Sequence, residues 1–236
     1  MTDLESLRLK VRPLLHFSAP ADALSVYYAF YHDPRRTRLY VHEAGGHADG
    51  FVAVCQTGQW LFQPTVVLHA ANAEVAVELL RQALVPGRPY YVITAPGLRD
   101  AIIEVMDIER PEINRIYMLD LSCFQPIINV LVVVEQGLGG RPRFVVRSQG
   151  EIVAEAGVNW HSPHFAGVFV HVTPDAQKRG WDRAVLAACT TWVVRSARQP
   201  LYIVNEGDEP NIALAEAVGY VDTSAREFTG EGVCRA

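Results

Sequence analysis

The sequence predicts an α/β fold made of two repeats, in which helices flank a mixed β-sheet. Segments with helical spacing of apolar residues alternate with short runs rich in Val, Ile, Tyr and Phe, which is typical of α/β proteins. The order of these segments is also nearly the same in both halves of the chain. We therefore expect one domain over residues 1–122 and a second over residues 123–236.

The composition is that of a folded protein and excludes several other classes. Half of the 236 residues are hydrophobic and 20% are charged, unlike a disordered chain. The net charge of −5 favours neither nucleic acid nor an anionic membrane as a partner. The longest apolar run, Ile127 to Val134, is far shorter than the roughly 20 residues that span a bilayer. Scattered cysteines and a charged start without a signal peptide favour the cytoplasm.

The first half opens with a predicted helix at Ala21–His32, where apolar residues recur at helical spacing before Asp33-Pro34 ends it. Three strands follow, at Arg38–Glu43, Gly50–Thr57 and Trp60–His69. Asn72 then caps a helix that extends to about Leu84. The half ends with a strand, a short helix and a strand, at Pro89–Thr94, Leu98–Met106 and Arg115–Leu121.

The second half repeats this order. Its first segment, Ile127–Glu135, is apolar and fits a helix or a strand equally well. A hairpin at Arg143–Arg147 and Glu151–Asn159 precedes a strand at Phe165–Thr173. The remaining elements alternate between helix and strand, at Gln177–Ser196, Leu201–Asn205, Asn211–Val218 and Tyr220–Thr229.

The richest chemical segment lies where the Phe165–Thr173 strand meets the long helix. A helix start presents free N–H groups and the positive end of the helix dipole. Gly180 permits a close backbone approach, and the cations Lys178, Arg179 and Arg183 surround the turn. This combination is typical of a pyrophosphate site. An ordinary strand–loop–helix with basic surface residues is the alternative.

The wider pattern resembles the GNAT superfamily of acyl-CoA-dependent N-acyltransferases, from about Phe144 to Tyr220. Val172-x-Pro174 and Gln177-x-x-Gly180-x-Asp182 occupy the places of its strand-end and loop motifs. The Leu201–Asn205 strand and the terminal Gly219-Tyr220 follow in the family's order. The resemblance implies tandem GNAT-like repeats and transfer of an acyl group, with acetyl expected, from CoA to a primary amine.

The resemblance also implies site residues. The pantetheine arm and acyl carbonyl would pair with the backbone of Val170, His171 and Val172. The pyrophosphate would be held by the loop and the first helical turn, that is by Gln177, Lys178, Arg179, Gly180, Trp181, Asp182 and Arg183. Acyl-CoA is the expected co-substrate, the acceptor is a small amine or a peptide, and no metal is required.

Three departures from the family pattern concern this region. Asp182 stands where a small residue is usual, so its carboxylate either faces the pyrophosphate or points outward and favours the helix dipole. Asp208 stands at the usual Asn, with Asn211 as the expected cap. Ala215 stands at the family's Tyr general acid, which leaves that role empty or filled from elsewhere.

The family's carboxylate base aligns with Ala166, where no acid is present. His164 and His161, in the adjoining turn, are the candidate catalytic residues, because imidazole can take a proton near neutral pH. The competing interpretation is two polar turn residues around a proline. Glu155 is a weaker candidate for the base.

The first half is expected to be a degenerate repeat without a CoA site. Its strand-to-helix junction, Ala70–Glu74, has no cation and no glycine, and Glu74 would repel phosphate. His42-Glu-Ala-Gly-Gly-His47 has one residue too many for a helical zinc motif. Because of Asp182 and Ala215, a non-catalytic acyl-CoA-binding or interaction module is the alternative function.

Overall fold

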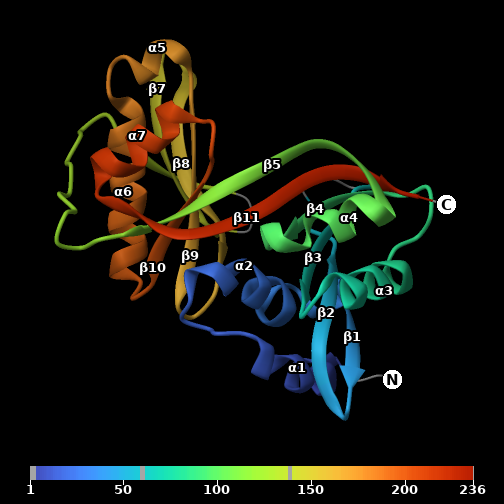
Figure 1. Ribbon diagram of the computed structural model, residues 1–236. Helices are drawn as coiled ribbons and strands as arrows, with labels where there is room; N and C mark the ends of the chain where they lie inside the picture. The colour runs from blue at the N-terminus through green and yellow to red at the C-terminus, as the bar shows by residue number, and fades with distance from the viewer. Residues whose placement is uncertain (1–3, 59–61, 138–139, 236) are drawn as a thin grey trace. The chain divides into compact units, whose positions relative to one another are not determined.

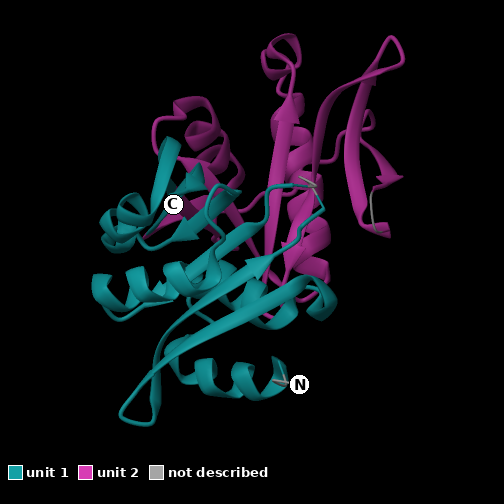
Figure 2. Ribbon diagram, turned by 90° about the vertical axis from the view of Figure 1, so that its right-hand side faces the viewer, with its two compact units in different colours: residues 1–114, 226–236 teal, residues 115–225 magenta. Residues whose placement is uncertain are grey.

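The structure is a computed structural model that describes residues 4–58, 62–137 and 140–235. The chain forms two compact units (Figure 2): unit 1 comprises residues 1–114 and 226–236, and unit 2 comprises residues 115–225. Both contain helices packed on a mixed sheet, so the predicted α/β fold class is confirmed. The domain boundary expected between residues 122 and 123 differs from this division and stays a prediction.

Unit 1 holds most of the first half of the chain (Figure 1). Its helices are α1 (Leu4–Val11), α2 (Ala23–Val26), α3 (Ala73–Ala83) and α4 (Arg99–Val105), and a π-helical turn at Tyr27–Tyr31 extends α2. Its strands are β1 (Thr37–Ala44), β2 (His47–Cys55), β3 (Thr65–Ala70), β4 (Pro89–Thr94) and the first part of β5 (Met106–Leu119). The strand order is β1-β2-β3-β4-β11-β5, with β11 defined below.

The sheet of unit 1 is covered by helices on both faces, and strand alternation explains why. Val52 and Val66 are buried in one cluster with residues of α3 and α4. Their strand neighbours Phe51 and Val67 are buried in another cluster with residues of α1 and α2. Because successive side chains of a strand point to opposite faces, a strand of consecutive apolar residues packs against helices on both faces of the sheet.

Unit 2 carries the remaining elements. Its strands are β6 (Val133–Gln136), β7 (Pro142–Ser148), β8 (Glu151–His161), β9 (Phe165–Val172), β10 (Gln199–Asn205) and the first part of β11 (Tyr220–Cys234). Its helices are α5 (Pro174–Gln177), α6 (Trp181–Arg195) and α7 (Glu209–Val218). The strand order is β11-β5-β10-β9-β8-β7-β6, and α6 packs across β7, β8, β9 and β10.

The long strands β5 and β11 are exchanged between the two halves of the chain. In unit 2, β5 of the first half is the neighbour of β10. In unit 1, β11 of the second half pairs antiparallel with β4, from Phe228↔Thr94 to Val233↔Pro89. Each sheet is therefore completed by a strand from the other half of the sequence.

The predicted elements are present, but several of their bounds differ: the long helix expected from Gln177 begins at Trp181, and the last strand continues past Thr229 to Cys234. Residues 127–132 form neither a helix nor a strand, and only residues 133–136 pair as β6. β5 begins at Met106 instead of Arg115, because pairing with β11 extends a polar segment that has little strand propensity of its own. Helix α1 was not expected, since its apolar periodicity is weak. The strand expected from residue 60 begins at Thr65, and residues 59–61 lie outside the described residues.

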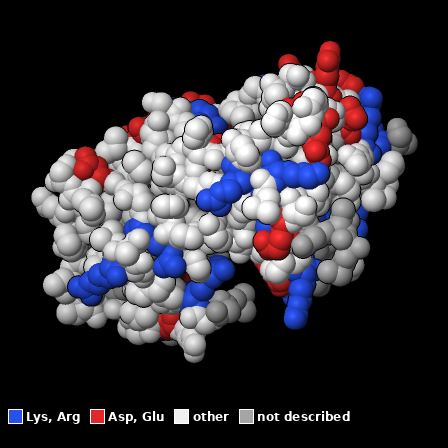
Figure 3. Space-filling view, turned by 90° about the horizontal axis from the view of Figure 1, so that it is seen from below, with Lys and Arg blue, Asp and Glu red and all other residues white. Residues whose placement is uncertain are grey.

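Surface charge is mixed on the face shown in Figure 3, where basic and acidic side chains form several separate groups. Within the described residues, no helix combines the length and the apolar character needed to cross a membrane. The His42–His47 segment is a hairpin: Gly45 and Gly46 turn the chain with positive φ, and His42 Nδ1 lies 2.6 Å from an Asp49 carboxylate oxygen.

One buried acid stands out in unit 1. Glu227 on β11 is only 8% exposed, and its carboxylate lies 3.5 Å from the Asn114 amide nitrogen, which also donates to the Thr229 hydroxyl at 3.0 Å. Burial raises the pKa of Glu227 to about 7. The folded protein therefore holds this proton at a pH where the unfolded chain has released it, and stability falls as pH rises from about 4.5 to 7.

We predict that Glu227→Gln raises the free energy of unfolding by roughly 2–3 kcal/mol at pH 8 and changes it little at pH 5. Gln keeps the shape of the side chain and cannot ionise. Urea unfolding at both pH values measures the effect. Glu231→Gln, on the same strand but partly exposed, is the control and should retain the parent's dependence on pH. Equal effects of Glu227→Gln at pH 5 and pH 8 would contradict the assignment.

Candidate functional site

The site begins where two parallel strands of unit 2 part. β9 and β10 pair from Phe165↔Gln199 to Val168↔Tyr202, and the ladder ends there. β9 nevertheless continues to Val172 and β10 to Asn205. Beyond Val168 and Tyr202, the backbone N–H and C=O groups on the facing edges of β9 and β10 therefore have no strand partner. An extended ligand can pair with such groups.

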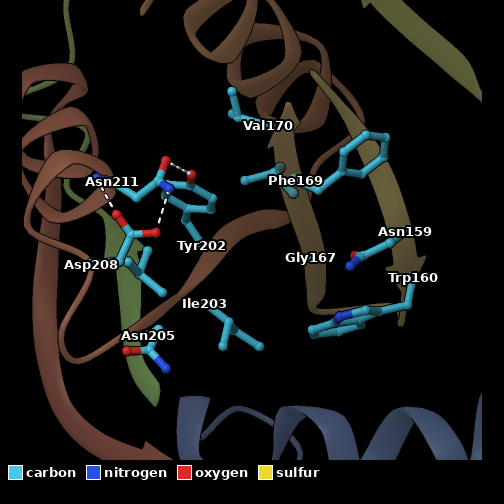
Figure 4. Close-up of a pocket in the computed structure, with 12 residues that line it drawn as sticks. Asn159, Trp160, Gly167, Phe169, Val170, Tyr202, Ile203, Asn205, Asp208 and Asn211 are labelled. Carbon is cyan, nitrogen blue, oxygen red and sulfur yellow. Dashed lines mark hydrogen bonds between the residues drawn. The ribbon is translucent and has the colours of Figure 1, made fainter. Parts of the chain in front are cut away.

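A pocket of about 200 Å³ fills the space between the parted strands (Figure 4). Its walls come from four elements of unit 2, namely β8, β9, β10 and α7. The lining residues are Asn159, Trp160, Gly167, Val168, Phe169, Val170, Tyr202, Ile203, Val204, Asn205, Asp208 and Asn211. Apolar and polar side chains both contribute, as in most small-molecule sites.

The polar wall is a connected hydrogen-bond chain. The Tyr202 hydroxyl donates to Asn211 Oδ1 at 2.8 Å, and Asn211 Nδ2 donates to Asp208 Oδ2 at 2.7 Å (Figure 4). Asp208, and not the expected Asn211, is the cap of α7, since its Oδ1 accepts the Asn211 backbone N–H at 3.2 Å. Burial raises the pKa of Tyr202, so its hydroxyl remains protonated throughout the neutral range.

The opposite wall depends on a β-bulge. Val158 pairs with Val168 and Trp160 pairs with Gly167, so Asn159 is an extra residue on β8. The Trp160 indole lies over Gly167, where any Cβ atom would collide with it. A glycine inside a strand often marks such a close approach. Arg141 Nη1 donates to the Asn159 carbonyl and so satisfies a backbone group of the bulge.

Beyond the end of β9, Gly180 begins the long helix α6. Gly180 is the N-cap residue with φ of +68°, a left-handed conformation that favours glycine, and a Cβ atom there would meet nothing within 4 Å. The turn's own carbonyls accept the N–H groups of Gln177, Arg179 and Gly180. The helix supplies no partner for the N–H groups of Trp181 and Asp182, at its first two positions.

Charges of both signs surround this helix start. Lys178, Arg179 and Arg183 are exposed, and the Arg179 guanidinium lies 4.9 Å from the centre of the Trp181 ring. Asp182 is instead 8% exposed, and its carboxylate accepts the Arg183 N–H at 2.7 Å. The Arg183 N–H, which was expected to face phosphate, is therefore already hydrogen-bonded. The Asp182 carboxylate also places an acidic group within the turn.

The two candidate catalytic histidines do not line the pocket in the part of the chain that the structure describes. His161 is the last residue of β8, where partial desolvation and the charges of Arg198 and Arg141 lower its pKa. His164 lies in the β8–β9 turn, and its carbonyl accepts the Gln199 N–H at 2.8 Å. Both side chains are exposed.

The other predicted site residues differ in their position and exposure. Val170 lines the pocket, Val172 is half-buried, and His171 is exposed with its ring against Phe169. Glu155 lies opposite His171 and forms an ion pair with Arg143, so its carboxylate already has a cationic partner. The family's acid and base positions are filled by buried alanines, Ala215 and Ala166.

Of the residues that line the pocket, only Val170 is among the site residues that the sequence predicts, and the polar residues Asn159, Tyr202 and Asn205 were missed. Tyr202 and Asn205 belong to a segment that was correctly predicted as a strand, but nothing in its pattern shows where the pairing ends. Gly167 within an apolar strand was the available signal for the crowded wall at Trp160.

The corresponding place in unit 1 has a different geometry. β3 and β4 pair from Thr65↔Tyr91 to Leu68↔Thr94, which is the last residue of β4. The Thr94 hydroxyl also donates to the Leu68 carbonyl at 3.0 Å, so these strands stay together. The predicted Asn72 cap is confirmed, because its side chain accepts the Val75 N–H at 3.0 Å.

Comparison with known proteins gives a result at the level of the fold. No protein-family model and no curated protein matches the sequence. A solved tandem GNAT protein from the clavulanic acid biosynthesis pathway matches 98% of this chain and 95% of its own, with a TM-score of 0.57 and 13% identity.

Two other solved structures extend this result. A GCN5-related N-acetyltransferase from Kribbella flavida matches over 92% of this chain and 96% of its own, with a TM-score of 0.63 and 14% identity. A Drosophila protein matches over 97% and 95%, with a TM-score of 0.67 and 13% identity. The chain therefore has the fold of the GNAT acetyltransferases, in the tandem form that its sequence predicts.

Proposed function

We propose that the protein is an N-acyltransferase that moves an acyl group, with acetyl expected, from CoA to the primary amine of a small molecule or peptide. The observation that carries the proposal is the parting of β9 and β10 after Val168↔Tyr202, with the Gly180 helix start beyond the end of β9. The cytoplasm is the proposed location, in keeping with the four free cysteines.

The binding role falls mainly to backbone groups. In the proposal, the pantetheine arm adds alongside β9 and pairs with the backbone of Val170, His171 and Val172, as an extra strand would. The pyrophosphate lies at the helix start, where the N–H groups of Trp181 and Asp182 and the cations Lys178, Arg179 and Arg183 would hold it, with Gln177 and Gly180 shaping the turn.

The chemistry needs positioning and one proton transfer. The amine nitrogen attacks the thioester carbonyl carbon, the carbon–sulfur bond breaks, and the proton lost by the amine balances the one gained by the thiolate. A strand N–H polarises the carbonyl. We assign removal of the amine proton to His164, with His161 as the second candidate, acting through water because neither ring lines the pocket.

A second candidate function is acyl-CoA binding without catalysis. The buried Ala215 at the family's acid position and the Asp182 carboxylate at the helix start favour it. An assay for free CoA, with acetyl-CoA and a panel of amines, separates the two. Steady release that depends on an amine supports the enzyme, whereas tight CoA binding without release supports the binding module.

We predict that Gly180→Glu abolishes CoA binding in a folded protein, because a carboxylate would enter the proposed phosphate site. Gly150→Glu is the matched control: Gly150 also has positive φ and no atom within 4 Å of its Cβ position, but lies in the β7–β8 turn. Gly180→Gln separates charge from backbone strain and should weaken binding less. Calorimetry that shows equal CoA affinity for Gly180→Glu and Gly150→Glu would place the phosphate site elsewhere.

We predict that each chain binds one CoA. In unit 1, β3 and β4 remain paired to Thr94, Asn72 occupies a helix N–H, and Glu74 takes the positive end of the dipole. Phosphate there would have to displace the cap and face a carboxylate, at a cost of roughly 1 kcal/mol each. Titration should saturate at one equivalent, and a stoichiometry near two would show that the first half also binds.

The proposed proton relay predicts a pH-dependent defect. His164→Ala should lower kcat at pH 7 and recover part of it near pH 10, where the amine substrate loses its proton unaided. His161→Ala, measured in parallel, should have the smaller effect. The same loss at every pH would assign His164 to packing or substrate contact, and no loss would remove it from the mechanism.

A further inference from the structure

The direction of β9 determines which end of the pocket would hold the acyl group of a bound acyl-CoA. β9 runs from Phe165 to Val172 and leads through α5 to the Gly180 helix start. A ligand with its phosphates at that helix start and its arm along β9 therefore places its far end toward Gly167 and Val168. Figure 4 shows Gly167 and Trp160 together, at the end of the pocket away from Val170.

Trp160 lines the pocket at that end because of the bulge. Without the extra residue Asn159, the alternation of β8 would carry this indole to the other face of the sheet. Bulges commonly re-aim a side chain in this way next to active sites. Trp160 is 4% exposed, and its indole lies against the backbone of Gly167, so it has little room to move outward.

We propose that Trp160, turned into the pocket by the bulge at Asn159, limits the length of the acyl chain and restricts the donor to short acyl-CoA such as acetyl-CoA. This inference rests on the proposed function. The other side chains near this end are smaller or lie to the side: Gly167 has no side chain, and Tyr202 is tied to Asn211. A large, fixed aromatic group at the closed end of a pocket excludes added methylenes by steric conflict.

The test compares acetyl-, butyryl- and hexanoyl-CoA by calorimetric affinity and by kcat/KM. The parent protein should bind butyryl-CoA at least about 10-fold more weakly than acetyl-CoA. Trp160→Ala should reduce this discrimination to within about 3-fold and admit hexanoyl-CoA, because it opens the closed end of the pocket. Trp192→Ala, which removes a half-exposed indole from α6, is the matched control and should keep the parent's preference.

The outcomes separate this inference from the proposed function. If the parent binds neither CoA nor acetyl-CoA, the proposed function and the inference both fail. If the parent and its variants bind CoA with the same affinity and Trp160→Ala keeps the parent's acyl preference, only the inference fails. Trp160→Phe serves if Trp160→Ala does not fold: a smaller ring should relax the discrimination partly, and an unchanged preference would overturn the inference.

Discussion

The site depends on the end of one hydrogen-bond ladder, between β9 and β10 at Val168↔Tyr202. Buried backbone groups need hydrogen-bond partners. Where two strands part within a sheet, other groups must therefore occupy the gap between them. Tyr202, Asn211 and Asp208 hold one side of the opening, and the bulge at Asn159 holds the other. The order of these parts makes the opening the candidate site: a pocket between the strands, then a helix start whose first N–H groups have no partner in the helix.

The same elements in unit 1 show what happens without the opening. β3 and β4 pair to the last residue of β4, and a threonine hydroxyl adds a further bond between them. Their helix start is already capped by Asn72 and carries Glu74. One element order therefore gives an open pair of strands in one half and a pair that stays closed in the other, because local pairing decides between them.

The sequence was informative where local chemistry determines structure. Asn72 capped its helix as predicted, and Gly180 and Gly219 lie at helix boundaries with positive φ. The repeated element order predicted the tandem fold. Features that arise from pairing between distant segments could not be predicted: the exchange of β5 and β11, the bulge at Asn159, and the role of Tyr202 in the pocket wall.

The most direct test of the central claim is amide hydrogen exchange with and without CoA. If CoA adds alongside the free edge of β9, it should protect the amides of residues 169–172 and of the α6 start, while β3 and β4 of unit 1 remain unchanged. Protection confined to other segments, or equal protection of both strand pairs, would contradict the account.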